Sequence, residues 1–311
     1  MTSNLIKRLC PLCGSENFDE IITLKENNII TSNPSYRIER ISELGLDSDQ
    51  LYPIVKCRLC EMIYSLYHLD DKREKIVYER IIDTEISKMK VLTLGRRIAD
   101  GRKWLKLLSL IDDSKQETVN LKVIDFGCGW GNLLLVAKGP GVLAIGFDVT
   151  SWKVAWAREQ GITICESEKE LMGYAPFDIG IMTSVLEHLR EPKKAIDTFT
   201  SLLKPGGYCL ITCIIHFAAH PFSWKELKKK VLRGLPIPKE INPWEHLNYF
   251  TPETLIKFLT SFGFVPIDST VRWITKDGKD RQSERNLLRK YWPWRQWLYI
   301  KIPIYWKFKG L

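Results

Sequence analysis

The sequence predicts an α/β fold, in which a doubly wound parallel sheet carries a small N-terminal module with four cysteines. Three observations lead to this prediction. Strand-like and helical segments alternate from residue 122 to residue 214, two Cys-x-x-Cys pairs stand within the first 60 residues, and a glycine-rich turn follows the first of the alternating strands. With 311 residues, 45% of them hydrophobic, the chain can form one large domain and an appendage.

The four N-terminal cysteines form two pairs, Cys10 with Cys13 and Cys57 with Cys60. Each pair can turn both of its sulfurs toward one ion, and four thiolates complete the tetrahedral coordination of Zn²⁺. We therefore predict a zinc-ribbon-like module over residues 1–69. Because four cysteines leave no open coordination position, the predicted zinc is structural.

The start of the chain carries Lys7 and Arg8 where a signal peptide would have its apolar run, and no apolar stretch reaches the roughly 20 residues that cross a bilayer. These features predict a cytoplasmic protein. In that reducing compartment, the eight cysteines are not expected to form disulfides, and the Cys-x-x-Cys spacing favours metal binding.

Residues 70–118 place apolar side chains at helical spacing and predict a helical connector or lid. The main domain is expected over 119–275. Its strands are predicted at 122–126, 143–148, 163–165, 179–183 and 208–214, and its helices from residue 132 and over 152–160 and 193–203. Such alternation predicts a parallel sheet that binds its ligand at the carboxyl ends of the strands.

The glycine-rich turn lies in the segment VIDFGCGWG, residues 123–131. A strand ends near Asp125, and the glycines after it allow the backbone to approach a ligand closely before a helix begins. The next strand ends in Asp148, whose carboxylate can accept hydrogen bonds from both hydroxyls of a ribose. An NAD site of the type G-x-G-x-x-G would need glycine where Asn132 stands, which disfavours a dinucleotide ligand.

Taken together, these motifs resemble those of class I S-adenosylmethionine-dependent methyltransferases over roughly residues 120–270. DFGCGWG matches the first motif and Asp148 the acid of the second, while FDIGIMTSVLEHL (177–189) and LLKPGGY (202–208) match later ones. The resemblance implies a Rossmann-like methyltransferase sheet, with 119–275 as the domain that binds S-adenosylmethionine. Asp125 and the glycines would hold the methionine moiety, Asp148 the ribose, and Val149 would flank the adenine. The full set of implied cofactor-binding residues is Asp125, Phe126, Gly127, Cys128, Gly129, Gly131, Asp148, Val149 and Thr183.

The cysteine pairs are also similar to those of bacterial methyltransferases from sugar and surface-polysaccharide pathways, although Glu61 follows the second pair where glycine is common. This similarity implies a small or glycan-type acceptor, namely a nucleotide- or lipid-linked sugar in surface-polysaccharide or natural-product biosynthesis. One alternative is O-methylation of an aromatic or quinone-like acceptor. Another is a zinc-ribbon binding module on an inactive methyltransferase scaffold, against which the intact glycine turn argues.

A general base is needed only if the acceptor must lose a proton, and histidines are the candidates. Glu187 and His188 follow the strand 179–183, at the edge where donor and acceptor would meet. The Glu245-His246 pair resembles one that serves the substrate site in some sugar C-methyltransferases, which implies that His246 is the base, with Glu245 orienting it and Tyr249 nearby. In the structural alternative, Tyr249 packs in the core and Thr251 caps a helix that begins at Pro252.

The formal net charge of +9 is concentrated near the end of the chain, where residues 271–311 hold 11 Lys/Arg and 3 acids. The basic aromatic segment 276–311 fits contact with a membrane surface, which would place the protein at the inner face of the membrane, and it equally fits a cover over the protein's own core. The basic segments are expected to attract an anionic acceptor. Nucleic acid is disfavoured because residues 183–188 lack the Asn/Asp-Pro-Pro-aromatic element of base amino-methyltransferases.

Overall fold

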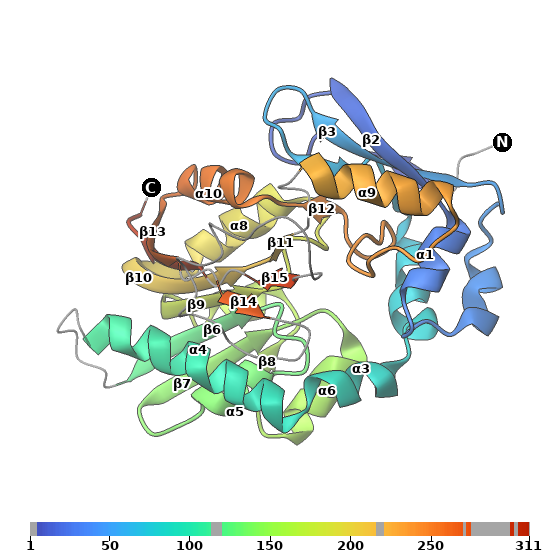
Figure 1. Cartoon of the computed structure of the whole chain (residues 1–311). Helices are drawn as coiled ribbons and strands as arrows, with labels where there is room; N and C mark the ends of the chain where they lie inside the picture. Colours follow the sequence, from blue (N-terminus) through green and yellow to red (C-terminus); the bar gives the residue numbers. More distant parts are fainter. Residues whose placement is uncertain are drawn as a thin grey trace.

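The computed structural model describes residues 5–112, 120–215, 221–269, 272–274, 299–301 and 304–310. Its centre is a sheet of seven strands in the order β13-β16-β10-β9-β6-β7-β8 (Figure 1). The five strands that continue from β10 to β8 are parallel, as predicted. Their bounds are β6 Leu121–Phe126, β7 Val142–Phe147, β8 Thr163–Cys165, β9 Phe177–Thr183 and β10 Leu203–Thr212.

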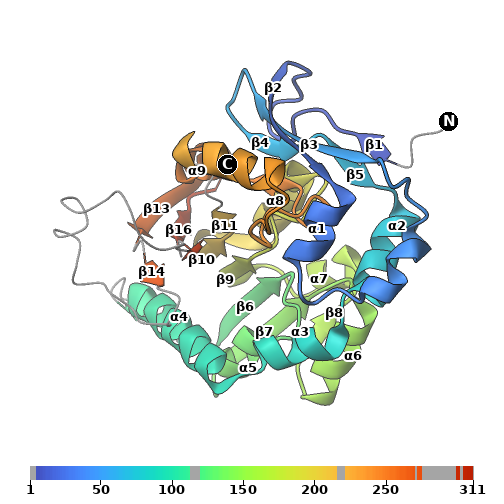
Figure 2. The same ribbon diagram turned by 45° about the vertical axis from the view of Figure 1, so that its right-hand side comes forward.

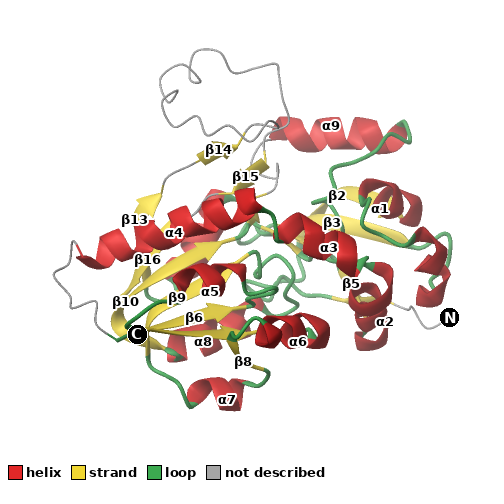
Figure 3. Cartoon of the chain, turned by 90° about the horizontal axis from the view of Figure 1, so that it is seen from below, coloured by secondary structure: helices red, strands yellow, loops and turns green. Residues whose placement is uncertain are grey.

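Helices cover both faces of the sheet, because its strands are apolar on both sides (Figure 3). Along β6, Leu121 and Val123 pack under one layer of helices, and Ile124 and Phe126 under the other. The first layer contains α4 (Leu94–Asp112), α5 (Asn132–Ala137) and α6 (Ser151–Glu159). The second contains α7 (Glu168–Met172), α8 (Pro192–Ser201) and α10 (Pro252–Thr260). The predicted cap of α10 is confirmed, since the Thr251 hydroxyl accepts a hydrogen bond from the backbone N–H of Thr254.

The far edge of the sheet is built from β13 (Phe264–Ser269) and β16 (Ile304–Phe308). Strand β16 lies between β10 and β13 and runs antiparallel to both. The Trp306 side chain is fully buried and meets Phe264 edge-on. Residues 304–308 follow the second expectation for the segment 276–311, since Trp306 and Phe308 pack in the protein's own core. Most of that segment lies outside the described residues, and so does the membrane contact expected from it.

The N-terminal module is joined to the main domain by a sheet to which both contribute strands, and the two pack together (Figure 2). Its antiparallel sheet has the order β12-β4-β3-β2, and β12 comes from the main domain. The strands are β2 (Phe18–Lys25), β3 (Leu51–Cys57), β4 (Ile63–Ser65) and β12 (Asn248–Tyr249), and β1 (Leu5–Lys7) pairs with β5 (Tyr67–Leu69). Helix α9 (Pro221–Leu232) packs Trp224 and Leu227 into the apolar cluster of this module, which also holds α1 (Glu26–Ser32) and the 3₁₀ turn η1 (Ile38–Leu44).

Within the described residues 70–112, helices connect the module to the sheet. They are α2 (Asp71–Ile76), the π-helical turn η2 (Val77–Ile81) and α3 (Thr84–Val91), followed by α4. Asp70 and Asp83 begin α2 and α3, because each carboxylate accepts a hydrogen bond from a backbone N–H of the first turn. Three further short strands, β11 (Ile214–Ile215), β14 (Arg272–Ile274) and β15 (Tyr299–Lys301), form a small sheet. Within the described ranges, no helix has the length and apolar character needed to cross a membrane.

Candidate functional site

A cavity of about 1030 Å³ opens at the carboxyl ends of β6, β7 and β9. The strand ends and the glycine turn form what we call the cofactor wall. Helices α2, η2 and α3, together with His188 and Glu245, also line the cavity and form what we call the acceptor wall. Eight of the nine predicted cofactor residues line the cavity, and Gly131 is the exception. The eight are Asp125, Phe126, Gly127, Cys128, Gly129, Asp148, Val149 and Thr183.

The three glycines of the turn have positive φ angles but serve different purposes. A Cβ atom at Gly127 would lie 2.5 Å from the Val185 side chain, and one at Gly131 would lie 2.5 Å from Ile162. These two glycines allow close packing of the turn. At Gly129, with φ of +56°, a Cβ atom would meet nothing within 4 Å. Gly129 therefore keeps the cavity open beside the backbone, as a site for a bound ligand requires.

Asp148 is held rigidly at the end of β7. Its Oδ2 accepts a hydrogen bond from the Gly129 N–H and its Oδ1 one from the Thr150 N–H, both at 2.8 Å. Each oxygen has a second lone pair that can accept a ribose hydroxyl. Val149, 80% exposed and next in the chain, offers an apolar surface for an adenine ring. This arrangement fits the role that the resemblance implies.

Asp125 is only 2% exposed, and no donor from the described residues reaches its Oδ1. Burial, together with the nearby Asp100 carboxylate, raises the pKa of Asp125 to about 8. A buried carboxyl group with an open acceptor atom calls for a cationic partner, and the methionine ammonium of S-adenosylmethionine is one. The residues present therefore fit this cofactor.

On the acceptor wall, the contacts of His188 assign its tautomer. Its Nδ1 lies 2.9 Å from the backbone carbonyl oxygen of Glu245 and 3.3 Å from the Tyr78 hydroxyl. A carbonyl oxygen can only accept, so Nδ1 carries the proton and the lone pair of the neutral ring is on Nε2. His188 lines the cavity and is thus placed to act as a base.

The Glu245 side chain also lines the cavity, but it does not orient His246. Its Oε1 accepts hydrogen bonds from Asn33 Nδ2 at 2.9 Å, the Tyr36 hydroxyl at 2.5 Å and Asn242 Nδ2 at 2.9 Å. The Nδ1 atom of His246 lies instead 2.7 Å from the carbonyl oxygen of Glu240. The predicted Glu245–His246 pair is corrected accordingly: two donors from the N-terminal module hold the carboxylate in another direction.

His246 and Tyr249 lie behind the cavity wall. His246 is 9% exposed and meets the His188 ring edge-on, with ring centroids 4.7 Å apart. Tyr249 is fully buried in β12 and packs edge-on against Trp224. Neither residue lines the cavity. Tyr249 therefore packs in the core, as the structural alternative expected. His246 is next to the site because its ring contacts the His188 ring.

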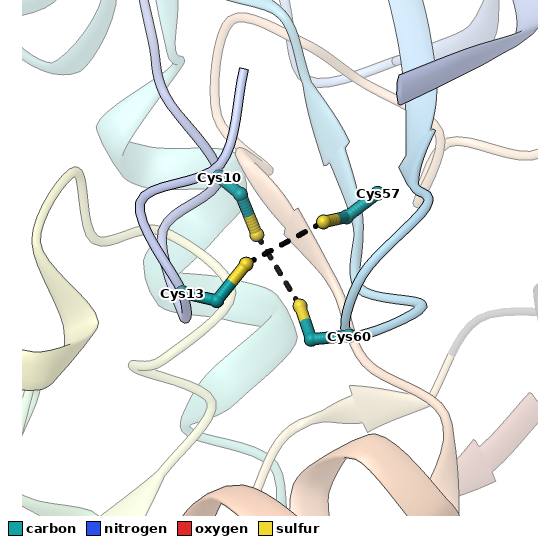
Figure 4. A group of neighbouring side chains, drawn as sticks. All are labelled: Cys10, Cys13, Cys57 and Cys60. Atoms are coloured by element: carbon teal, nitrogen blue, oxygen red, sulfur yellow. Dashed lines mark hydrogen bonds between the residues drawn. The ribbon is translucent and has the colours of Figure 1, made fainter. Parts of the chain in front are cut away.

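The four N-terminal cysteines converge on one point, although they come from two separate turns (Figure 4). All their sulfur atoms lie within 4.8 Å of one another, with Cys10 and Cys60 at 3.4 Å and Cys13 and Cys57 at 3.5 Å. A tetrahedral Zn²⁺ with Zn–S bonds of about 2.3 Å would set the sulfurs about 3.8 Å apart. Glu61 ends the second turn at φ +64°, a conformation in which glycine is ordinarily found. The cluster has the geometry of a metal-binding module, and none of its cysteines lines the cavity.

Comparison with known proteins supports the cofactor that the cavity lining fits. Residues 94–269, more than half of the chain, match the family described as a methyltransferase domain. The chain belongs to this family. Its cofactor wall is that of an S-adenosylmethionine-dependent methyltransferase, and the fold is the Rossmann-like fold of this class.

The matches to curated relatives cover about half of this chain. The ubiquinone biosynthesis O-methyltransferase of Colwellia psychrerythraea is 28% identical over 169 residues, which are 51% of this chain and 66% of the relative, just under two thirds of its length. That of Glaesserella parasuis is 29% identical over 189 residues, 55% of this chain and 80% of the relative.

Solved methyltransferase structures are also similar to this chain. Magnesium protoporphyrin IX methyltransferase from Synechocystis PCC 6803, with bound S-adenosylmethionine, has 16% identity and a TM-score of 0.42, covering 76% of this chain and 89% of that chain. An S-adenosylmethionine-dependent methyltransferase from Mesorhizobium loti has 16% identity and a TM-score of 0.42, covering 66% of this chain and 97% of that chain.

Several residues of the methyltransferase site were not singled out from the sequence. Tyr78 lines the cavity from the π-helical turn, and Trp130 and Trp152 line it beside the glycine turn, with ring centroids 5.0 Å apart. Trp130 stands within the motif itself, and its aromatic side chain at a ligand-binding turn was the available signal. Tyr78 carried no such signal, because its helical spacing is that of an ordinary core residue.

Proposed function

We propose that this methyltransferase transfers the methyl group to a hydroxyl of a neutral aromatic or quinone-like acceptor. The observation that carries the proposal is the orientation of His188 on the cavity wall, because proton removal from a hydroxyl requires a base beside the acceptor. The curated relatives, which are named as O-methyltransferases, support the same reaction type.

In this reaction the bound cofactor supplies an electrophilic methyl group on a sulfonium. Asp148 and the glycine turn would hold the donor in place, and His188 Nε2 would accept the proton that the acceptor hydroxyl loses on methylation. The Glu245 carbonyl oxygen, 2.9 Å from Nδ1, stabilises the imidazolium that results. Alignment of the two reactants contributes roughly 7–11 kcal/mol, and the base about 10²–10⁴ in rate.

The charged side chains of the acceptor wall indicate which charge the acceptor has. The short helices contribute three acids to it, Asp71, Glu74 and Glu79, of which the first two pair with Arg190 and the third with Lys75. Because each of these acids is paired with a cation, the wall has no excess of positive charge to attract a phosphate, which favours a neutral acceptor over the anionic one expected from the net charge. Carboxylates also accept hydrogen bonds from sugar hydroxyls, which makes a neutral glycan the second candidate. Ile82 and Leu189 on the same wall suit an aromatic ring.

The acceptor is tested by a turnover assay with labelled S-adenosylmethionine on three matched panels: hydroxylated benzoquinols and catechols, neutral glycosides, and nucleotide sugars. We expect methyl ethers from the first panel, identified by mass spectrometry of the product. Turnover of neutral glycosides alone would transfer the assignment to the second candidate. Methylation of nucleotide sugars in preference to both other panels would overturn the argument from the charge of this wall.

We further propose that the cysteine cluster holds one structural Zn²⁺. The convergence of four sulfurs within 4.8 Å supports it, and such a site stabilises a small module by on the order of 10 kcal/mol. Native mass spectrometry is expected to find one zinc per chain. The double replacement of Cys57 and Cys60 by serine should release it and lower the melting temperature. Cys165→Ala, which removes a buried cysteine outside the cluster, should retain the metal. Folded wild-type protein without metal would contradict the proposal.

A further inference from the structure

Arg8 places a buried guanidinium at the junction between the N-terminal module and the methyltransferase domain. It is 7% exposed. Its Nη1 donates to the carbonyl oxygens of Leu247 at 2.9 Å and Ser65 at 3.4 Å. Its Nη2 donates to the carbonyl oxygen of Arg190 at 3.0 Å and to Asn248 Oδ1 at 2.9 Å. Among the described residues, all its hydrogen-bond acceptors are neutral oxygens. A buried cation is costly when it lacks a carboxylate partner, so its place here calls for an explanation.

The oxygens that Arg8 binds belong to the segments that shape the loop around His188. The Asn248 side-chain amide donates to the carbonyl oxygens of Leu186 at 2.8 Å and Leu189 at 2.7 Å. The backbone N–H groups of Leu247 and Asn248 both donate to the Glu187 carbonyl oxygen, at 2.7 and 3.0 Å. Arg8 itself binds the carbonyl oxygen of Arg190. The carbonyl oxygens of residues 186, 187 and 189 are bound by Leu247 and Asn248, which Arg8 holds, so the carbonyl groups on both sides of His188 depend on this arginine.

The module contacts the same site at a second point. The Nδ1 of His188 bonds to the Glu245 backbone carbonyl oxygen, and the Glu245 carboxylate is held by Asn33 and Tyr36 of the module. Both the loop that carries His188 and the residue that orients its ring are thus anchored to the N-terminal module. The guanidinium holds its donors in a fixed planar fork, which suits it to bind acceptors on three chain segments at once, at Ser65, Arg190 and Leu247–Asn248.

We propose that Arg8 is a positioning residue for the methyl-transfer reaction, acting through His188. The inference rests on the proposed role of His188 as the base. It makes the N-terminal module a support for the acceptor wall, in addition to whatever stability its metal-binding cluster provides. Arg8 itself lies outside the cavity lining and is not a catalytic residue.

The test compares Arg8→Gln and Arg8→Lys with Arg58→Gln, a control that removes an exposed arginine of the same module whose partner is Asp19. For Arg8→Gln we expect kcat to fall about tenfold to hundredfold, since a small misplacement of a catalytic group has an effect of that order. The Kd for S-adenosylmethionine should stay within about twofold, because the cofactor wall is untouched. Arg8→Lys keeps the charge but not the fork and should show a smaller loss. Arg58→Gln should match the wild type.

A double-mutant cycle with His188→Ala separates positioning from general stability. If Arg8 acts through His188, adding Arg8→Gln to His188→Ala lowers kcat little further, whereas independent losses would multiply. Multiplying losses, or full activity of Arg8→Gln, would overturn the proposal. Should Arg8→Gln not fold, the same cycle is made with Arg8→Lys. Full activity of His188→Ala would instead refute the proposed function, so the two failures are distinguishable.

Discussion

Replacing His188 by alanine is expected to lower the turnover number about 10²–10⁴-fold, while the Kd for S-adenosylmethionine changes by less than about twofold. The loss follows because the ring lines the acceptor wall with its Nδ1 proton bound to the Glu245 carbonyl oxygen, which leaves Nε2 as the basic atom. Cofactor affinity should be preserved because the cofactor contacts are assigned to Asp148 and the glycine turn and not to this ring. Single-turnover kinetics and calorimetry measure the two quantities on the same protein.

The matched control is His246→Phe, which keeps an aromatic ring edge-on to His188 but removes the nitrogen bonded to the Glu240 carbonyl oxygen. Since His246 lies behind the wall, we expect activity within a few fold of the wild type. An unchanged rate in His188→Ala, together with a deep loss in His246→Phe, would return the role of base to His246.

Replacing Asp125 by asparagine is expected to weaken the binding of S-adenosylmethionine about tenfold to hundredfold, because a charged partner of the methionine ammonium is lost. The same change should stabilise the ligand-free protein at neutral pH. Burial beside Asp100 raises the pKa of Asp125 from 3.8 to about 8, so ionisation of this group opposes folding.

The sign of the pH dependence follows from the protons that each state binds. Below pH 3.8 the group is protonated in both the folded and the unfolded chain and has no effect. Between pH 3.8 and about 8 only the folded chain keeps the proton, so the free energy of unfolding falls by about 1.4 kcal/mol per pH unit as pH rises. Above pH 8 both states are ionised, and the loss is complete.

Thermal melts of ligand-free wild type and Asp125→Asn from pH 5 to pH 9 measure this effect. The wild type should lose stability more steeply with rising pH up to about pH 8, and the affinity of the wild type for S-adenosylmethionine should rise over the same range. Parallel melting curves for the two proteins would show that Asp125 is ionised in the ligand-free site. Equal cofactor affinities would remove Asp125 from the binding of the ammonium.

The acceptor side was only partly predictable. The sequence pointed to His188 and His246 equally, and the choice between them depends on contacts between residues far apart in the chain. His188 bonds to Glu245, 57 residues away, and Arg8 bonds to Asn248, 240 residues away. Glu245 was expected to orient His246, but its carboxylate bonds to Asn33 and Tyr36, which a local Glu-His pattern could not reveal. The last strand, 304–308, was likewise not predicted, because lysines lie within and beside it and long stretches of chain separate it from strand β10.

The sequence by itself determined the α/β class, the methyl donor and the cysteine cluster. These features depend on residues that are close in the chain: a strand, a glycine turn and an acid within residues 123–148, and two Cys-x-x-Cys turns. Backbone geometry over such short distances follows from residue type, because glycine at positive φ and a strand-end carboxylate have few alternatives. Only the tertiary structure decided which histidine faces the cavity, what holds it there and what charge surrounds the acceptor, since those properties arise where distant segments pack together.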